Sequence, residues 1–224
     1  MQPRILRRRF LQAGGLALTS AAMPPLASLS MKVQAGESNG RIKKAVGWDM
    51  IQEKLSPEDK FRLLKDVGFD GVEVSSAGLK SRGIAPKEMA RASEKIGIPI
   101  HGVSGAGHGD LKAVFEEAAL YGATSILYVV RADPAGSYME NYRRSQATLR
   151  EAVPHAEKAG IPILIENVWA TFLIEPLSMA RYIDELDSPF VQAYFDVGNV
   201  MRWGVPQQWI EVLGKRIGKI HVKE

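Results

Sequence analysis

The chain has 224 residues, of which 46% are hydrophobic and 24% charged, a composition typical of a globular protein with enough apolar material for one large domain. It has no cysteine, which excludes disulfides and thiolate metal sites. The formal net charge is +4, but the first thirty residues hold four arginines and no acid, so the rest of the chain is close to neutral. The high pI therefore belongs to the N-terminal segment and does not indicate a nucleic-acid-binding surface.

The N-terminal segment has the pattern of an export signal. Arg7 to Leu11 (RRRFL) contains a twin-arginine motif, and the modestly apolar stretch Ala13–Met23 follows it. That stretch is too short and too rich in small and polar residues to be a stable membrane anchor. We expect residues 1–35 to be a twin-arginine (Tat) signal peptide for export to the periplasm or another extracytoplasmic space, and residues 36–41 to be a linker. A basic N-terminus that happens to precede alanines is the alternative.

From Ile42 onward, strand-like runs alternate with helix-like segments. Each run is short and apolar, β-branched or aromatic, and successive runs start 26 to 36 residues apart, which is about one βα unit. The seven predicted strands are Lys44–Trp48, Gly71–Ser75, Ile98–Val103, Ser125–Val130, Ile161–Glu166, Val191–Asp196 and Ile217–Val222.

The helix-like segments, six in all, carry boundary signals. Gly68, Gly97, Gly122 and Gly160 each follow a helix-like segment and precede a strand, a place where glycine takes the left-handed conformation at little cost. Capping residues and prolines mark the helix starts. The clearest starts are Ser56-Pro57, Pro86-Lys87, Asp110-Leu111 and Glu175-Pro176.

A series of βα units predicts a parallel α/β sheet or barrel. We predict a (β/α)8 TIM barrel over residues 42–224, of which about seven strands are present, so that the barrel is incomplete at its C-terminus. A doubly wound open sheet is the alternative. The glycines of Gly102–Gly109 do not support it, because they match neither a Walker loop nor a dinucleotide-binding fingerprint.

Two carboxylates and one imidazole end three successive predicted strands. Glu166 ends IPILIE, Asp196 ends VQAYFD, and His221 lies near the end of IGKIHV. The carboxyl ends of parallel barrel strands meet at one rim, so these side chains are expected to converge. Such a group suits a divalent metal of intermediate hardness, such as Mn, Mg, Co or Zn. Taken singly, each strand-end carboxylate is equally well explained as a cap of the following helix.

The segments IENVW, FDVGN and HVKE, in this order and at these intervals, resemble the xylose-isomerase-like TIM barrels, a superfamily of sugar isomerases and epimerases that also holds inosose dehydratase and the endonuclease IV type of repair enzyme. The resemblance runs from about Arg41 to the last residue. It implies a metal-dependent isomerase or epimerase that acts on a sugar or keto-sugar through an enediolate, with Glu166 as metal ligand and base and Asp196 and His221 as further ligands. It also implies a fourth ligand, a glutamate on strand eight, which would lie beyond Glu224.

Other polar residues at the same rim are expected to contact the substrate: Glu73, His101, Asn199 and Glu224. Asn199 stands where many relatives have a histidine; its amide can bind a hydroxyl but cannot act as acid or base near neutral pH. His108 lies in a loop and is not expected to bind metal, and His155 lies in mid-helix, at the surface or in packing. The partner is therefore a small-molecule sugar and not a nucleic acid, with a homo-oligomer possible.

Three other functions remain. A lyase or dehydratase of a keto-sugar or inosose would use the same metal and enolate chemistry. A non-catalytic sugar-binding barrel would bind its sugar at the same rim. The chain can also be an inactive fragment. An endonuclease of the AP type would need several more histidines for a zinc cluster and a basic DNA-facing rim, which a near-neutral body with four histidines does not offer.

Two placements stay open. Alternation puts Lys219 on the same side as His221, inside the barrel, so either the strand starts later or the lysine lies at the bottom rim. The tryptophans near strand ends, Trp48, Trp169 and Trp203, can form apolar walls for sugar rings or can be core residues.

Overall fold

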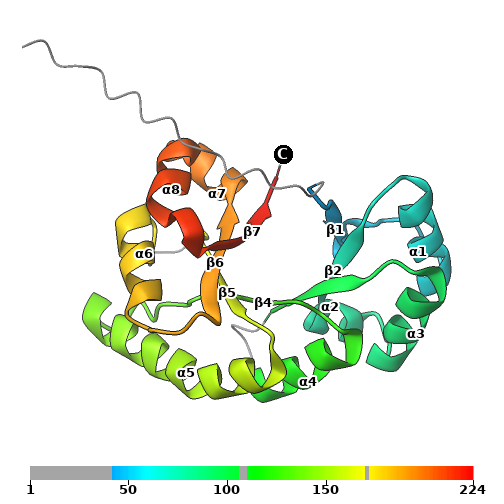
Figure 1. Ribbon diagram of the computed structural model, residues 1–224, viewed down its shortest axis with the longest axis horizontal. Helices are drawn as coiled ribbons and strands as arrows, with labels where there is room; N and C mark the ends of the chain where they lie inside the picture. The colour runs from blue at the N-terminus through cyan, green and yellow to red at the C-terminus, as the bar shows by residue number, and fades with distance from the viewer. Residues whose placement is uncertain (1–41, 106–109, 170–171, 224) are drawn as a thin grey trace, which may run out of the picture. The chain divides into compact units, whose positions relative to one another are not determined.

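The computed structural model describes residues 42–105, 110–169 and 172–223. The predicted signal peptide (1–35) and linker (36–41), His108 and Glu224 lie outside these residues. Seven strands form one parallel sheet in the order β1 to β7, and the sheet curls into an open barrel with the helices on its outer side (Figure 1). This confirms the predicted (β/α)8 TIM barrel with seven strands.

The elements follow the predicted alternation. The strands are β1 (Ala45–Gly47), β2 (Gly71–Ser75), β3 (Ile100–Ser104), β4 (Ile126–Tyr128), β5 (Ile163–Glu166), β6 (Val191–Asp196) and β7 (Ile217–His221). The α-helices are α1 (Pro57–Asp66), α2 (Ser76–Ser81), α3 (Pro86–Ile96), α4 (Leu111–Tyr121), α5 (Tyr138–Ala159), α6 (Pro176–Asp184), α7 (Val197–Met201) and α8 (Pro206–Leu213). Two short 3-10 helices are η1 (Trp48–Met50) and η3 (Gly214–Arg216).

The predicted helix boundaries are confirmed where capping chemistry marks them. The Ser56 hydroxyl accepts a hydrogen bond from the Asp59 backbone N–H at 3.2 Å and begins α1, and Asp110 Oδ1 accepts one from the Lys112 N–H at 2.9 Å and begins α4. The four glycines predicted to follow helices, Gly68, Gly97, Gly122 and Gly160, all have positive φ. Local sequence therefore determines where these helices stop.

The count of six helices is wrong for the described residues, which contain eight α-helices. The additional ones, α2 and α7, have six and five residues, too few to show a helical period in the sequence. They directly follow β2 and β6 and are capped by the last residues of those strands, Ser75 and Asp196. Two predicted strands also start too early, because Pro99 and Pro162 precede β3 and β5 and cannot donate to a ladder.

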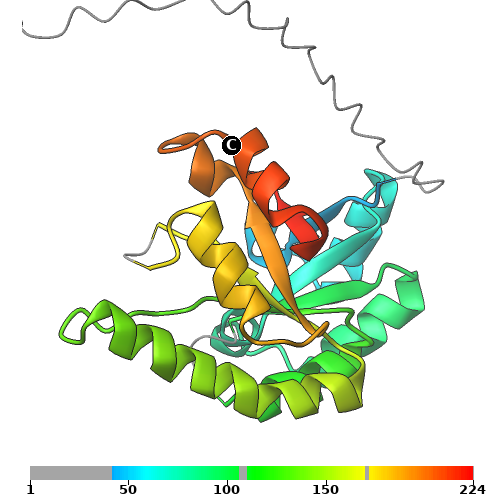
Figure 2. The same ribbon diagram turned by 60° about the vertical axis from the view of Figure 1, so that its left-hand side comes forward.

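Alternation along the strands separates two apolar regions. Residues such as Ile163, Ile165 and Phe195 face the helices and join the large core cluster between sheet and helices. Leu127, Leu164 and Tyr194 face the other way and form a small cluster inside the barrel. Figure 2 shows α6 (yellow) and α8 (red-orange) beside β6 (orange) on the outer side of the sheet. The apolar side chains pack between the sheet and the helices and inside the barrel, and polar side chains lie at the carboxyl ends of the strands.

The start of β7 decides the position of Lys219. Ile217 pairs with Ala193 and Lys219 pairs with Tyr194, so Gly218 is an extra residue in a bulge. The strand therefore begins at Ile217, and the alternative of a later start is wrong. The Lys219 ammonium lies beside Thr124 and Ser125, which directly precede β4, and so it occupies the bottom of the barrel interior.

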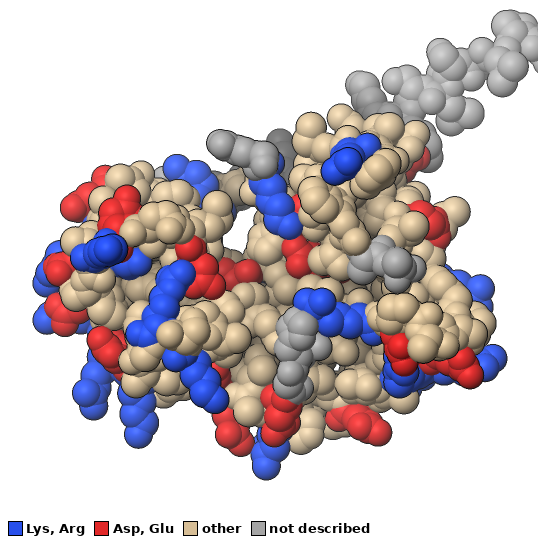
Figure 3. All heavy atoms as spheres, turned by 180° about the vertical axis from the view of Figure 1, so that it is seen from behind, with Lys and Arg blue, Asp and Glu red and all other residues tan. Residues whose placement is uncertain are grey.

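The surface is of mixed charge. Lys and Arg side chains are interspersed with Asp and Glu over the face seen in Figure 3. Among the described residues, no helix is both long and apolar enough to cross a bilayer.

Candidate metal centre

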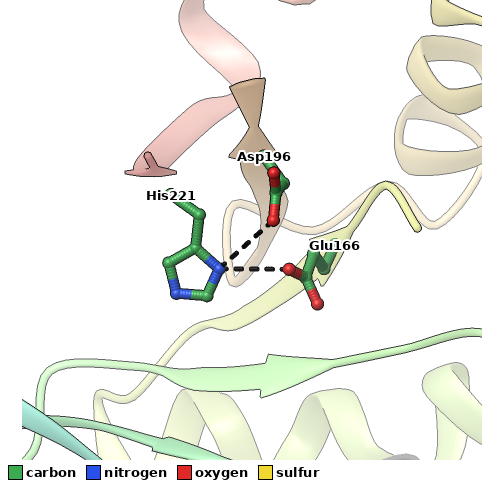
Figure 4. Close-up of side chains that lie close together, drawn as sticks. All are labelled: Glu166, Asp196 and His221. Atoms are coloured by element: carbon green, nitrogen blue, oxygen red, sulfur yellow. Dashed lines mark hydrogen bonds and ion pairs between the residues drawn. The ribbon is translucent and has the colours of Figure 1, made fainter. Parts of the chain in front are cut away.

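Glu166, Asp196 and His221 meet at one rim of the barrel, as predicted. Each is the last residue of its strand, β5, β6 or β7, and Asp196 pairs directly with His221 across the ladder. His221 Nδ1 lies 3.0 Å from Glu166 Oε1 and 3.8 Å from Asp196 Oδ2 (Figure 4). One ligand atom from each residue falls within 4.8 Å of the others, which is a group that can hold a metal ion.

The geometry fits a divalent cation. Nitrogen and oxygen ligands lie about 2.0–2.2 Å from ions such as Zn and Mg, so ligands at right angles around one ion stand about 3.0 Å apart. The mixed set of one imidazole and two carboxylates also suits these ions. Asp196 is fully buried, and its Oδ2 is in contact with the Lys223 ammonium. A buried carboxylate requires a compensating cation, and in this structure the Lys223 ammonium is that cation.

Asp196 caps a helix and also faces the other two candidate ligands. Its Oδ1 accepts a hydrogen bond from the Asn199 backbone N–H at 2.8 Å and caps α7. Its Oδ2 points to His221 and Glu166 (Figure 4). Asn167, also buried, fixes the backbone of Asp196, because its Oδ1 accepts from the Asp196 N–H at 2.7 Å and its Nδ2 donates to the Asp196 carbonyl at 2.9 Å. The ligand oxygen is therefore held rigidly.

A lysine that sequence reasoning did not assign to the site stands beside the two carboxylates. Lys223 Nζ contacts Asp196 Oδ2 and lies 3.7 Å from Glu166 Oε1. Its ammonium also donates to Asn199 Oδ1 at 3.2 Å. The signal for it was the period of two, since Lys223 follows His221 by two residues and so extends from the same side of the chain. Its positive charge compensates the carboxylates in this structure.

Glu73 of β2 lies behind His221. Glu73 Oε1 is 3.4 Å from His221 Nε2, and the ring of Tyr194 lies 4.0 Å, centroid to centroid, from the imidazole. Burial alone would raise the pKa of Glu73, but hydrogen bonds from His221 and Tyr194 and the charge of His221 hold that pKa below its usual value. Burial opposes the charge on His221 too, but the hydrogen bonds to Glu166 and Glu73 raise the pKa of His221 to about 9.

His101 of β3 lies deeper in the barrel and contacts Lys219. Lys219 Nζ is 2.8 Å from His101 Nδ1 and donates to the His101 carbonyl at 2.7 Å. Burial and the Lys219 charge lower the pKa of His101 to about 4, so the imidazole is neutral at neutral pH. Burial also lowers the pKa of Lys219 to about 8.

The remaining predicted residues lie beside the candidate ligands, in the core or at the surface. Asn199 lies in α7 and donates from Nδ2 to the Asn167 carbonyl at 2.8 Å, next to the candidate metal ligands. Trp48 is 1% exposed and packs on Phe61, so it is a core residue and not a sugar wall. Trp169 and Trp203 are 64% and 76% exposed at the same rim as Asp196, where sugar walls were an open possibility. His155 is exposed on α5, as expected.

Comparisons with known proteins agree with the fold. Among curated proteins there is no match. The crystal structure of 3-keto-D-glucoside 4-epimerase, YcjR, from E. coli in its apo form superimposes with a TM-score of 0.70 at 20% identity, covering 82% of this chain and 80% of that one. D-allulose 3-epimerase from Methylomonas sp., in complex with D-allulose, gives 0.67 at 16% identity, with 83% and 73% covered.

A third similar structure is the probable 3-DHS dehydratase AsbF from Bacillus anthracis, with a TM-score of 0.66 at 14% identity over 80% of this chain and 72% of that one. At such identities these likenesses concern the fold. A family model, the xylose isomerase-like TIM barrel, matches residues 61–224. With nearly three quarters of its length matched, the chain belongs to the xylose isomerase-like TIM barrel family.

Proposed function

We propose that this protein is a divalent-metal-dependent isomerase or epimerase of a sugar or keto-sugar. The observation that carries the proposal is the convergence of Glu166, Asp196 and His221 within 4.8 Å at the carboxyl ends of β5 to β7. Chemistry in this barrel architecture occurs at that rim. The fold shared with two sugar epimerases supports the same reading.

The reaction begins with removal of a proton from the carbon next to a sugar carbonyl, which leaves an enediolate. A divalent metal (Mn, Mg, Co or Zn) held by the three residues would supply Lewis-acid stabilisation of the negative charge on oxygen. Glu166 is the base: one carboxylate oxygen, Oε1, faces His221, and Oε2 points away from it and takes the proton (Figure 4). Isomerisation can return the proton from this same carboxyl, whereas epimerisation requires a second group on the opposite face of the sugar.

The substrate is held by the polar groups around the ligands. Asn199, whose backbone N–H bonds Asp196, offers its side-chain amide to a hydroxyl. Lys223, whose ammonium contacts Asp196 and Asn199, would offer a donor to a substrate oxygen when the site holds a metal. Glu73 and His101 contribute from the deeper side of the barrel. Glu224, which lies outside the described residues, is assigned to the same role on its position after Lys223.

The decisive test compares the metal content of the wild type with that of Asp196→Asn by elemental analysis after loading with Mn or Mg. The asparagine keeps an oxygen to cap α7 but loses the charge, so a stoichiometric metal is expected in the wild type and little in the variant. Asp110→Asn is the matched control, because Asp110 also caps a helix but is not one of the candidate ligands. Absence of metal from the loaded wild type would refute the proposal.

Product analysis then identifies the reaction class. Proton NMR in D2O with keto-sugars is expected to show deuterium entering the carbon next to the carbonyl and an isomer or epimer accumulating. Glu166→Gln should abolish the exchange. A dehydrated product in place of an isomer would assign the chain to the lyase alternative, and bound metal without any exchange would favour a sugar-binding barrel.

We also propose that the protein is exported through the Tat route to the periplasm or another extracytoplasmic space. The support is the RRRFL motif followed by a short apolar stretch. Replacing Arg7 and Arg8 with lysine should keep the protein in the cytoplasm, as measured by cell fractionation. Export that is unaffected by this change would contradict the Tat route.

A further inference from the structure

A pocket of about 660 Å³ opens beside the metal ligands, between the loop after β5 and the segment formed by α7, α8 and the loop joining them. Its walls are apolar and aromatic with a few polar groups among them. The residues that carry the argument are Asn167, Trp169, Asn199, Arg202, Trp203 and Gln208. A pocket of this size and lining, next to a catalytic rim, is of the kind that binds small molecules.

Two residues of the pocket wall also contact the ligand cluster. Asn167 and Asn199 line the pocket, and they hold Asp196 through its backbone and through its Oδ1, respectively. Lys223 reaches Asn199 Oδ1 from the side of the metal ligands. A molecule in the pocket therefore shares a polar wall with a molecule at the metal, and one extended ligand can occupy both places.

Two tryptophans present their rings to solvent here. Trp169 is 64% and Trp203 is 76% exposed, which is unusual for so large an apolar side chain. Each side chain is held by one contact. Trp169 Nε1–H donates to the Asn199 carbonyl at 2.8 Å, and the Arg202 guanidinium lies 4.8 Å from the Trp203 ring centroid. The rings are thus held in place and remain largely exposed, with Arg202 over one face of Trp203.

The aromatic ring faces and the polar groups of the pocket wall together indicate which kind of ligand it binds. A pyranose ring has C–H faces that pack on aromatic rings and hydroxyl edges that need hydrogen bonds, which Asn199, Arg202 and Gln208 can provide. An anionic ligand is not favoured, because the Glu175 carboxylate, which caps α6 through the Leu177 N–H at 2.9 Å, also stands at the wall. A neutral sugar ring matches this wall best.

We propose that the pocket binds a second sugar ring, so that the natural substrate is a disaccharide or glycoside whose reacting ring lies at Glu166, Asp196 and His221 and whose neighbouring ring stacks on Trp203 and Trp169. This inference rests on the function proposed above and specifies its substrate class.

Isothermal titration of the Mn-loaded protein tests it. The probes are cellobiose, maltose, lactose and sucrose, each compared with its component monosaccharides D-glucose, D-galactose and D-fructose. At least one disaccharide is expected to bind tenfold or more tightly than either of its components. Trp203→Ala should remove that gain and leave monosaccharide affinity and metal content within twofold, whereas Trp203→Phe, which keeps a ring face, should retain most of it.

The inference is overturned if no disaccharide binds better than its components, or if Trp203→Ala weakens monosaccharides and disaccharides equally. It is also overturned if sedimentation velocity finds a dimer that dissociates in Trp203→Ala, because a second copy of the chain would then cover the pocket. Failure of the proposed function gives a different result. If the protein binds no metal and shows no turnover but still prefers a disaccharide, the pocket proposal stands and the isomerase proposal is refuted.

Discussion

Lys219 of β7 reaches His101 of β3 through the interior of the barrel. Its Nζ lies 2.8 Å from His101 Nδ1 and also donates to Thr124 Oγ1 at 3.0 Å and Ser125 Oγ at 2.6 Å. An ammonium can only donate, so Nδ1 accepts and the neutral imidazole carries its proton on Nε2. No carboxylate forms an ion pair with this lysine among the described residues, and its ammonium donates to neutral acceptors.

The first prediction concerns this buried charge. Burial lowers the pKa of Lys219 from 10.5 to about 8, so the folded state releases its proton more readily than the unfolded state. Between pH 8 and 10.5 the unfolded state holds more protons, and the wild type should therefore gain stability relative to Lys219→Met as pH rises. We expect a gain of about 1–2 kcal/mol, since solvent screening reduces the ideal 1.4 kcal/mol per pKa unit.

Urea unfolding of the metal-free protein at pH 7.5, 9 and 10 measures this difference. Lys95→Met is the control, because Lys95 is exposed and pairs with Glu58 at the surface. If the difference in unfolding free energy between wild type and Lys219→Met stays constant over this pH range, the lowered pKa of Lys219 is contradicted.

The second prediction concerns the proton released when metal binds. The pKa of His221 is raised to about 9 in the metal-free protein, so the imidazole is protonated at pH 7.5, whereas a metal ligand must be neutral. Binding of Mn or Zn at pH 7.5 should therefore release about one proton. Titration calorimetry in two buffers of different ionisation enthalpy counts it. The release should disappear above about pH 10, and release of no proton at pH 7.5 would show that His221 is not a ligand.

The third prediction assigns Glu73 to the support of His221. Glu73 Oε1 lies 3.4 Å from His221 Nε2, the nitrogen that faces away from the two carboxylates. Such a partner orients a metal-binding imidazole, and its loss typically costs 10- to 100-fold in metal affinity. Glu73→Gln should weaken Mn binding about tenfold in a competition titration with a chelator. The exposed Glu211→Gln on α8 is the control, and equal affinities in both variants would leave Glu73 with a substrate role only.

The fourth prediction concerns the close approach of α7 to the chain after β7. A Cβ placed on Gly198 would lie 2.7 Å from Lys223 Cβ, which has no freedom to rotate away, so Gly198→Ala should force the backbone at Lys223 to move. Such overpacking typically costs about 1–3 kcal/mol, measured by thermal or urea unfolding. In Gly47→Ala the new methyl would lie 3.6 Å from Met50, an ordinary contact, and stability should be nearly unchanged.

Much of the fold is determined by local sequence. The Ser56-Pro57 and Asp110 caps, the glycines after four helices, and the alternation of Ile163, Leu164, Ile165 and Glu166 depend on neighbours a few residues away. These signals act at short range, and so they predicted the βα series, the parallel barrel and the strand-end group of Glu166, Asp196 and His221.

The tertiary structure decided what depends on distances across the barrel. Whether Trp48 is core and Trp203 exposed, whether Glu73 stands behind His221, and whether Lys219 reaches His101 are set by how far the sheet curls and by the bulge at Gly218. The sequence by itself determined the succession of strands and the residues that end three of them, Ser75, Glu166 and Asp196. Only the closure of the sheet, a sum of small twists and register shifts between residues far apart in the chain, determined which side chains meet.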